Sequence, residues 1–347
     1  MSSRTVSRKK EHVDLVLKNE VGFHSKTTGF EEWDFVHNAL PELDFSETDP
    51  AQTFLGKKLA APFIVSCMTG GYAGAKKINR DLAEVCAEFP IAMGIGSQRQ
   101  AMESDLFHES FKIAREVAPN IPLIGNIGAA QIAKQTSIDT IRTAVELIRA
   151  DALAVHLNPA QELLQPEGNP AFKGVLEGIE MLVGKLPIPI IVKEIGAGIS
   201  AQVAQLLTDT GVKYIDVAGA GGTSWSGVEL LRRKSGSVDM SMFWDWGIRT
   251  ADSIIAVRNV LKKGVVIGSG GITNGLEAAK ALALGADMIG AARPMLQELN
   301  AHGKKGLQKL IESWIYQLRG AMFLTGSATI AQLQRTPIIQ SHKQKSV

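Results

Sequence analysis

Eight short apolar runs recur along the chain from residue 62 onward, and this repetition constrains the fold more than any other feature. The runs are Phe63–Met68, Ile91–Gly96, Pro122–Asn126, Ala152–His156, Pro189–Lys193, Tyr214–Ala218, Val265–Ser269 and Met288–Ala292. Helical patterns lie between them, for example at Ala75–Phe89, Asp139–Arg149, Ser200–Thr210, Thr250–Lys262 and Gly275–Leu284. Continuous apolar strands that alternate with amphipathic helices predict a parallel sheet covered by helices. Eight such units are the number that a (β/α)8 barrel requires.

A doubly wound open sheet is the alternative α/β fold, because it also alternates strands and helices. It gives no reason for a count of eight. A dinucleotide-binding sheet would also carry Gly-x-Gly-x-x-Gly after its first strand, whereas Met68-Thr69-Gly70-Gly71 stands there. We therefore predict a (β/α)8 TIM barrel.

The barrel accounts for residues 62–335, with Gly306–Ala331 as one or two closing helices. Residues 1–61 lack clean periodicity beyond a short helix at Arg8–Leu17. We expect this N-terminal extension to pack on the barrel and on a neighbouring subunit. Residues 336–347 are predicted to be a flexible tail.

Composition excludes several classes of protein. A chain with 45% hydrophobic and 21% charged residues is typical of a globular protein with a large core. Its net charge of +2, from 37 basic and 35 acidic residues, provides no basic field for nucleic acid. Two cysteines rule out a disulfide framework and a cysteine-built zinc site. No apolar run reaches the roughly 18 residues of a membrane helix, and no targeting signal is recognisable, so we predict a cytoplasmic protein.

Polar or glycine-rich residues follow every one of the eight runs. Barrel enzymes build their active sites from the C-terminal ends of the strands. Turn formation alone could explain any single cluster. Turn formation is a weaker explanation for all eight clusters together, because they include Arg99, His156, Glu162 and Lys193. The sequence therefore predicts an active site at this end of the barrel.

A phosphate site is predicted after the last two strands. Gly268-Ser269-Gly270-Gly271 follows the seventh strand, and Gly290-Ala291-Ala292-Arg293 lies at the eighth. Backbone N–H groups at a glycine loop and at a helix N-terminus attract anions, because no Cβ blocks approach and the helix dipole favours negative charge.

Lys193 ends the fifth strand, where its ammonium group would enter the mouth of the barrel. It could form a Schiff base, neutralise a phosphate or stabilise an anionic cofactor ring. Pairing with Glu194 is a weaker interpretation, because neighbours on a strand point to opposite faces. Gly219–Gly222, followed by Thr223, would let a flat ring approach the backbone. Together with the phosphate cradle, these residues suggest flavin mononucleotide (FMN).

Glu162 is a candidate Mg²⁺ ligand, since magnesium takes one or two carboxylates and completes its shell with water and phosphate oxygens. A general base and a solvated surface charge are its other interpretations. Arg99 and the N-terminal group of Arg8, Lys9 and His12 could bind an anion. A diphosphate is therefore a reasonable substrate group. The long segment Gly219–Gly247, with three tryptophans, is a candidate lid.

Several motifs resemble those of the type 2 isopentenyl-diphosphate isomerase family, over about residues 5–335. They are Arg8-Lys9-x-x-His12, His37-Asn38-Ala39-Leu40-Pro41-Glu42, Met68-Thr69-Gly70-Gly71, Gly96-Ser97-Gln98-Arg99, His156-Leu157-Asn158-x-x-Gln161-Glu162, Lys193-Glu194-x-Gly196, Gly221-Gly222-Thr223-Ser224-Trp225, Trp246-Gly247-Ile248 and Gly268-Ser269-Gly270-Gly271. The combination is highly specific, above all the Asn-Ala-Leu-Pro-Glu and His-Leu-Asn-x-x-Gln-Glu segments.

The resemblance implies a TIM-barrel enzyme that interconverts isopentenyl and dimethylallyl diphosphate without net redox change. Reduced FMN would act as acid and base through its N5 atom, with Gln161 assisting, while NADPH reduces the flavin and Mg²⁺ binds the diphosphate. The family also implies a homo-oligomer, a tetramer or octamer, in which Arg8 and Lys9 reach a neighbouring subunit. Neither nucleic acid nor membrane would be a partner.

Site residues follow from the same resemblance. Catalytic roles fall on Gln161, His156 and Lys193, and the Mg²⁺ ligand is Glu162. Substrate contacts fall on Arg8, Lys9, His12, Ser97, Gln98, Arg99, Asn158 and Gln161. FMN contacts fall on Met68, Thr69, Gly70, Ser97, Asn126, Lys193, Thr223, Gly271, Thr273, Ala292 and Arg293.

One departure from the family pattern concerns Ile272-Thr273-Asn274-Gly275, where an arginine-bearing variant is expected. It leaves the contact of Thr273 with the FMN phosphate open. Two other functions also stay open. An FMN-dependent oxidoreductase of the hydroxyacid oxidase or dihydroorotate dehydrogenase type would share the phosphate cradle and Lys193, but leaves Arg8, Lys9 and Glu162 without purpose. A flavin- or phosphate-sensing protein would not depend on Gln161.

Overall fold

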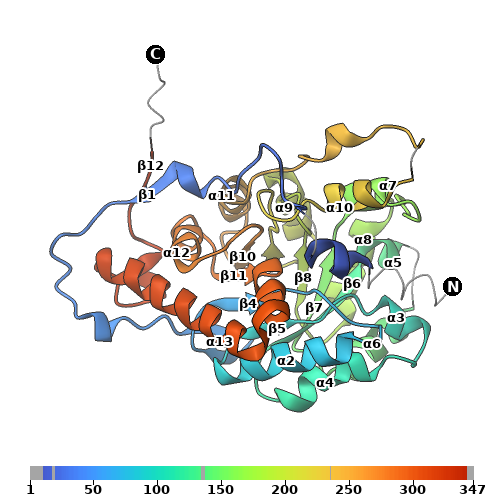
Figure 1. The fold of residues 1–347 in the computed structure, drawn as a ribbon, viewed down its shortest axis with the longest axis horizontal. Helices are drawn as coiled ribbons and strands as arrows, with labels where there is room; N and C mark the ends of the chain where they lie inside the picture. Colours follow the sequence, from blue (N-terminus) through green and yellow to red (C-terminus); the bar gives the residue numbers. More distant parts are fainter. Residues whose placement is uncertain (1–10, 18–19, 134–136, 235, 342–347) are drawn as a thin grey trace.

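The computed structural model describes residues 11–17, 20–133, 137–234 and 236–341. Eight parallel strands form a closed barrel in the order β10-β11-β4-β5-β6-β7-β8-β9 (Figure 1). Their bounds are β4 Phe63–Val65, β5 Ala92–Gly94, β6 Leu123–Gly128, β7 Ala152–His156, β8 Ile190–Lys193, β9 Tyr214–Asp216, β10 Val265–Ser269 and β11 Met288–Ala291. Each strand falls within or overlaps one predicted apolar run, so the predicted TIM barrel is confirmed.

Helices surround the barrel because each buries one apolar face against the strands (Figure 1). The principal ones are α2 Ala75–Glu88, α4 Glu109–Val117, α6 Ile138–Leu147, α8 Val175–Lys185, α9 Ala201–Asp209, α11 Thr250–Val260, α12 Gly275–Ala283 and α13 Arg293–Leu324. Short helices α3 Arg99–Glu103, α5 Ala129–Ala133, α7 Pro159–Leu164, α10 Trp225–Arg232 and α14 Ile330–Leu333 occupy the connections. Side-chain caps set several starts: Ser137, Ser200 and Asn274 each accept a backbone N–H of the first turn. Residues 11–17 are also helical.

The barrel interior is apolar toward the N-terminal ends of the strands. Its apolar side chains include Ile124, Ala154, Ile191, Tyr214 and Ile267. Because side chains on a strand alternate between faces, the residue two positions further along each strand also points inward. Those residues are Asn126, His156, Lys193, Asp216 and Ser269. The interior therefore changes from apolar to polar at the C-terminal ends of the strands.

A short hairpin closes the other end of the barrel. Strands β2 (Gln52–Phe54) and β3 (Lys57–Leu59) pair antiparallel, and Phe54 and Leu59 join the interior apolar cluster. The ring of Phe54 lies 6.3 Å from that of Tyr214. These two strands lie in the N-terminal extension, which lacks clean periodicity, so the hairpin was not expected from the sequence.

At the periphery, β1 (Trp33–Phe35) of the N-terminal extension pairs antiparallel with β12 (Ile338–Gln340) near the C-terminus (Figure 1). Residues 336–347 were predicted to be a flexible tail, but residues 338–340 of that segment form this strand. Pairing satisfies backbone groups that neither short segment could satisfy alone. Its partners are some 300 residues apart, so local sequence patterns do not reveal it.

Two matching ion pairs lie at the N-terminal ends of the strands. Arg115 on α4 binds Asp151, which precedes β7 and also accepts the N–H of the first residue of β6. Arg258 on α11 binds Asp287, which precedes β11 and accepts an N–H from β10. The two arrangements are four barrel units apart, so they brace opposite sides of the barrel in the same way. We call them the Arg115 clasp and the Arg258 clasp.

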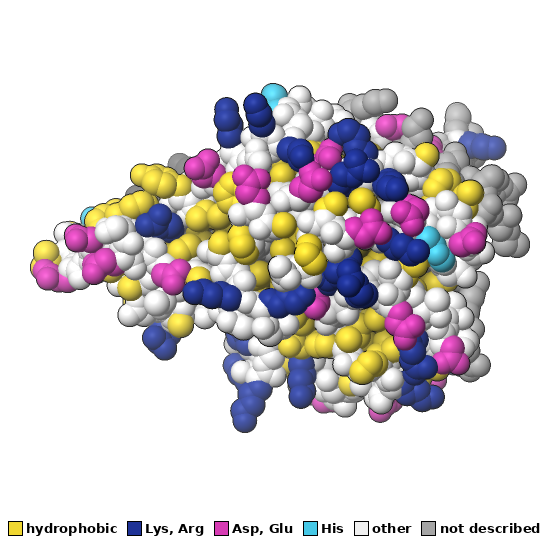
Figure 2. Space-filling view, turned by 90° about the horizontal axis from the view of Figure 1, so that it is seen from below, with side chains coloured by type: hydrophobic (Ala, Val, Ile, Leu, Met, Phe, Trp, Pro, Cys, Tyr) yellow, Lys and Arg dark blue, Asp and Glu magenta, His cyan; other side chains and the backbone are white. Residues whose placement is uncertain are grey.

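The surface carries charges of both signs. On the face shown in Figure 2, basic and acidic side chains are interspersed with apolar ones. Among the residues that the structure describes, no helix is sufficiently long and apolar to cross a membrane.

Candidate active site

A cavity of about 510 Å³ opens at the C-terminal ends of the strands. Its floor is the polar layer of the barrel interior. The glycine loops after β9 and β10 line one side, and the start of α13 lines another. Val13, Val16 and Phe23 contribute apolar lining from the N-terminal extension. A volume of this size suits a small cofactor together with a small substrate.

Most of the predicted site residues line this single cavity. They are His12, Met68, Thr69, Gly70, Ser97, Arg99, Asn126, His156, Asn158, Gln161, Glu162, Lys193, Thr223, Gly271, Thr273, Ala292 and Arg293. They come from segments spread over 280 residues, which the closed barrel brings to one end. Arg8 and Lys9 lie outside the described residues.

Gln98 does not line the cavity. Its side chain is fully buried, where its amide donates to the Ala144 carbonyl oxygen (2.6 Å) and its Oε1 accepts the Asn126 N–H (3.2 Å). The predicted direct contact with substrate therefore has no support from its position. Gln98 instead connects the end of β6 to α6, which fixes Asn126 at the cavity floor.

The glycines after β9 also have a packing role that the sequence did not reveal. A Cβ on Gly221 would lie 2.3 Å from the Thr28 backbone nitrogen, and one on Gly222 would lie 2.5 Å from that of Gly271. Gly221 also has a φ of +118°, which favours glycine. These residues are required for close packing between the two glycine loops and the N-terminal extension. They leave a smooth, side-chain-free wall along the cavity.

The predicted phosphate site lies where the Gly270–Gly271 loop faces the first turn of α13. Ala292 caps this helix and Arg293 begins it, and both line the cavity, so the positive end of the helix dipole lies at the cavity wall. Thr273 is already engaged, because its backbone N–H and its hydroxyl both donate to Glu277 Oε2 (2.7 and 3.0 Å). A phosphate would have to share these donors with a carboxylate.

Two polar pairs make up much of the cavity floor. His156 Nδ1 lies 2.8 Å from Asn126 Oδ1. The Lys193 ammonium donates to the carbonyl oxygen of Glu194 and lies 3.9 Å from Asp216 Oδ2. Burial raises the pKa of Asp216, although Lys193 and a hydrogen bond from Ser269 oppose the shift.

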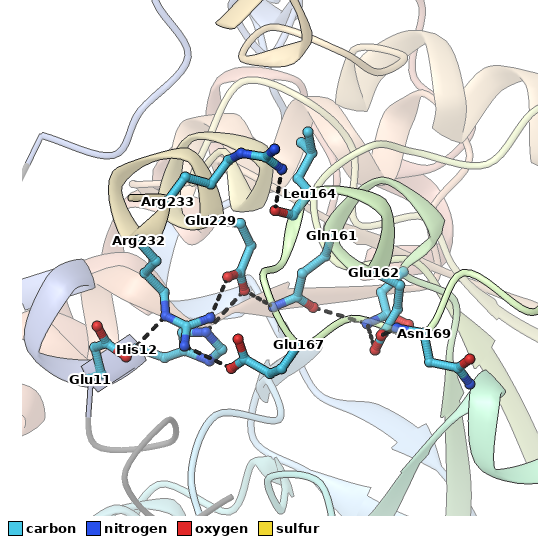
Figure 3. Close-up of polar contacts among 11 residues, drawn as sticks. Glu11, His12, Gln161, Glu162, Leu164, Glu167, Asn169, Glu229, Arg232 and Arg233 are labelled. Atoms are coloured by element: carbon cyan, nitrogen blue, oxygen red, sulfur yellow. Dashed lines mark hydrogen bonds and ion pairs between the residues drawn. The ribbon is translucent and has the colours of Figure 1, made fainter. Parts of the chain in front are cut away.

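Gln161 is anchored by a buried carboxylate that the sequence did not reveal. Its Nε2 donates to Glu229 Oε1 on α10 (2.8 Å), while His12 Nε2 lies 2.9 Å from the same oxygen (Figure 3). Arg232 binds Glu229 Oε2 (2.6 Å) and extends the network to two exposed acids. Burial acts to raise the pKa of Glu229, but the hydrogen bonds from His12, Gln161 and Arg232 outweigh it and lower that pKa.

Glu162 stands at the cavity wall with both carboxylate oxygens oriented. Oε2 accepts the Asn169 N–H (2.6 Å), and Oε1 accepts from Asn158 Nδ2 (3.1 Å). Within the described ranges, no group of three His, Cys, Asp or Glu residues could hold a metal. A single carboxylate suits Mg²⁺ that is held mainly by phosphate and water. The buried Asn158 Oδ1 also lacks a hydrogen-bond partner in the described part of the chain, which fits a ligand beside Glu162.

The candidate lid is tied to the N-terminal extension. The Trp244 indole donates to the Gly22 carbonyl oxygen (2.8 Å), and the Asp245 carboxylate accepts the backbone N–H groups of His24 and Ser25. Ser224 reaches across the segment to the Trp244 carbonyl oxygen (2.6 Å). The extension and the segment between β9 and α11 therefore form one wall over the cavity.

Comparisons with known proteins agree with this architecture. The sequence model of the family described as FMN-dependent dehydrogenase matches residues 2–113 and 128–340. The structure resembles mandelate oxidase with (S)-2-phenylpropionate (TM-score 0.65, 17% identity, 98% of this chain and 97% of that one). It also resembles a flavocytochrome b2 mutant with pyruvate bound (TM-score 0.69, 20% identity, 97% and 85%). Fold and cavity thus define a member of the FMN-dependent dehydrogenase class of barrels.

Sequence relatives narrow this class. The isopentenyl-diphosphate delta-isomerase of Pseudescherichia vulneris is 48% identical, over 96% of this chain and 97% of the relative. Those of Pelodictyon phaeoclathratiforme (45%; 97% and 98%) and Sulfurisphaera tokodaii (44%; 96% and 91%) are nearly as similar. The chain belongs to the isopentenyl-diphosphate delta-isomerase family, as the motifs indicated.

Three residues that shape the site escaped prediction: Asp216, Glu229 and Arg232. Asp216 could have been found, because it pairs in register with Lys193 on the next strand and therefore points the same way. Glu229 and Arg232 lie in the expected lid, where an acid and a base three residues apart look like an exposed helical ion pair. Only the packing of α10 against α7 buries them.

Proposed function

We propose that this protein interconverts isopentenyl diphosphate and dimethylallyl diphosphate on reduced FMN. The observation that carries the proposal is the junction of two features in one cavity: a polar barrel floor bounded by a side-chain-free wall, and a single oriented carboxylate, Glu162, at its edge. The floor suits a flat ring and the carboxylate suits a metal diphosphate. The family relationship supplies the identity of the substrate.

FMN fits the residues present. The wall built by Gly221 and Gly222 admits a planar ring, and the first turn of α13 with the Gly270–Gly271 loop would receive the phosphate. Met68, Thr69, Asn126 and Lys193 lie around the floor. When bound and reduced, FMN supplies an electron-rich ring that can act as acid and base beside the alkene, which becomes positively charged on protonation.

The protein's own contribution is orientation. Because Glu229 engages Gln161 Nε2, the amide oxygen of Gln161 points toward Asn158, whose Nδ2 donates to it (2.9 Å). The contact between His156 Nδ1 and Asn126 Oδ1 (2.8 Å) fixes the orientation of the imidazole ring. Gln161 and His156 would thus hold the hydrocarbon part of the substrate, while Lys193 provides positive charge beside the ring.

Further parts of the proposal concern partners. Mg²⁺ on Glu162 would bind the diphosphate, with Arg99 and His12 adding positive charge, and with Arg8 and Lys9 supplied from a neighbouring subunit of a tetramer or octamer. NADPH would reduce the flavin. A soluble diphosphate substrate is consistent with a cytoplasmic enzyme.

Proton NMR tests the function directly. Isopentenyl diphosphate would be incubated with the protein, FMN, Mg²⁺ and dithionite, and we expect the methyl signals of dimethylallyl diphosphate to appear. Their absence after flavin reduction has been verified by absorbance would contradict the proposal. Stoichiometric consumption of NADPH or of a 2-hydroxy acid would instead indicate the alternative oxidoreductase.

A further inference from the structure

Lys193 and Asp216 form a buried pair of opposite charges under the cavity. They lie at the same level on neighbouring strands β8 and β9. Their exposed fractions are 8% and 5%, and Lys193 Nζ lies 3.9 Å from Asp216 Oδ2. At such burial each charge depends on the other, because neither is well solvated.

Asp216 is fixed independently of Lys193. Its Oδ1 accepts a hydrogen bond from Ser269 Oγ (2.5 Å) on the other neighbouring strand, β10. The short Ser269 side chain therefore orients the carboxylate from β10, while Lys193 lies on β8. Such a carboxylate can position the ammonium group of Lys193.

The other ionisable groups around Lys193 do not offset its charge in the same way. The Glu194 carboxylate is turned back onto the N–H groups of Ile195, Gly196 and Ala197 (2.6, 2.9 and 2.7 Å). The thiol of Cys67 stays neutral, since burial raises its pKa to about 12. His156 is next to Lys193 in register, but is bound to Asn126. The charge beneath the flavin site is thus governed by the Lys193–Asp216 pair.

We propose that Asp216 is a positioning residue that holds Lys193 and offsets its charge, and thereby sets the reduction potential of the bound flavin. The inference rests on the proposed FMN site. A lone lysine would stabilise the extra negative charge of a reduced ring, whereas a lysine with a fixed counter-charge stabilises it less. The pair therefore keeps the reduced flavin electron-rich, which suits a reaction without net electron transfer.

Two substitutions with opposite charge effects test this. Asp216→Asn keeps the size of the side chain and an acceptor for Ser269 but removes the negative charge. We expect it to raise the FMN midpoint potential by about 30 mV or more, a tenfold change in the equilibrium for a two-electron couple. Lys193→Met should lower the potential. General disturbance of the site would move both variants in the same direction.

Asp151→Asn is the matched control. It also removes a carboxylate from a partly buried ion pair, but at the opposite end of the barrel, so it should leave the potential unchanged. Potentials would be measured on the FMN-loaded enzyme by equilibration with reference dyes. An Asp216→Asn potential within a few millivolts of wild type would overturn the inference. Failure of the wild-type protein to bind FMN would contradict the proposed function instead.

Discussion

Gln161 Nε2 lies 2.8 Å from Glu229 Oε1, although 68 residues separate them in the chain. Glu229 is fully buried and receives three donors, from His12, Gln161 and Arg232. One carboxylate on α10 therefore orients a cavity residue on α7 and binds the N-terminal helix (Figure 3). The N-terminal helix, which contributes to the cavity wall, and Gln161 on α7 therefore belong to one network centred on Glu229.

Replacing Glu229 by glutamine should impair catalysis more than it impairs folding. The neutral amide cannot satisfy three donors, so Gln161 loses its fixed orientation. Misplacement of a site group by about 1 Å can lower the rate about 100-fold, and we expect a fall in kcat of that order. Steady-state conversion of isopentenyl diphosphate would measure it.

Glu167→Gln is the control for this variant. Glu167 also binds Arg232 (2.7 Å), but it is exposed and does not touch Gln161. Its substitution should leave kcat within about twofold of wild type. An equal loss of kcat in both variants would show that the ion pairs of Arg232, and not the orientation of Gln161, account for the effect.

Glu162→Gln should weaken the response to Mg²⁺. Loss of groups that merely orient metal ligands commonly costs 10- to 100-fold in metal affinity, so loss of a ligand should raise the half-saturating Mg²⁺ concentration at least about tenfold. Titration of Mg²⁺ at saturating substrate would measure this. Asn169→Ala keeps the backbone N–H that binds Glu162 and should titrate like wild type; a normal titration of Glu162→Gln would place the metal elsewhere.

Glu277→Gln should strengthen FMN binding. Glu277 holds the backbone N–H and the hydroxyl of Thr273 at the predicted phosphate site. Removing its negative charge frees donors and eliminates repulsion of the phosphate, so we expect the Kd of FMN to fall about threefold to tenfold. Flavin fluorescence quenching would measure it. Glu312→Gln, an exposed change on α13, should have no effect, and unchanged affinity in Glu277→Gln would place the phosphate away from Thr273.

The barrel was predictable because the sequence pattern that identifies each strand is local. Each strand is a continuous apolar run, and each run ends where a side chain of the site begins, as in Val192-Lys193 or Val155-His156. Asn126 on β6 and Glu162 on α7, the helix after β7, then follow from their positions at or soon after the ends of the predicted runs. The β2–β3 hairpin and the β1–β12 pair were not predictable, because their segments lie outside the regular alternation of apolar runs and helical patterns that identifies the barrel strands.

The pairing of charged residues on different strands and helices could not be predicted from the sequence either. Sequence patterns place Lys193 in the cavity but do not say which acid faces it, and the adjacent Glu194 is turned onto backbone amides instead. The motif Gly96-Ser97-Gln98-Arg99 pointed to substrate, yet its Gln98 side chain holds β6 instead. A motif identifies residues that matter together, and only the packing determines which of them reach the cavity.

The Arg115 clasp should make the protein sensitive to acid. Burial opposes ionisation of Asp151, but hydrogen bonds from Lys57, from the Leu123 N–H and from Arg115 outweigh it and hold its pKa below the ordinary value. A carboxyl with a lowered folded-state pKa stabilises the fold above its unfolded-state pKa of about 4, and this stabilisation is lost as pH falls through the folded-state value.

Asp151→Asn should therefore lower the free energy of unfolding by about 2 kcal/mol at pH 7, the typical contribution of hydrogen bonds to a charged group. The difference from wild type should shrink as the pH falls below about 4, because the unfolded wild-type chain then binds a proton, and it should disappear once the pH has also fallen through the lowered folded-state pKa. Urea unfolding at several pH values would measure both effects. Asp287→Asn in the Arg258 clasp should cause a similar loss at pH 7, because that carboxylate braces β10 and β11 as Asp151 braces β6 and β7. A loss confined to one of the two variants would mean that the clasps are alike in geometry but not in their contribution to stability.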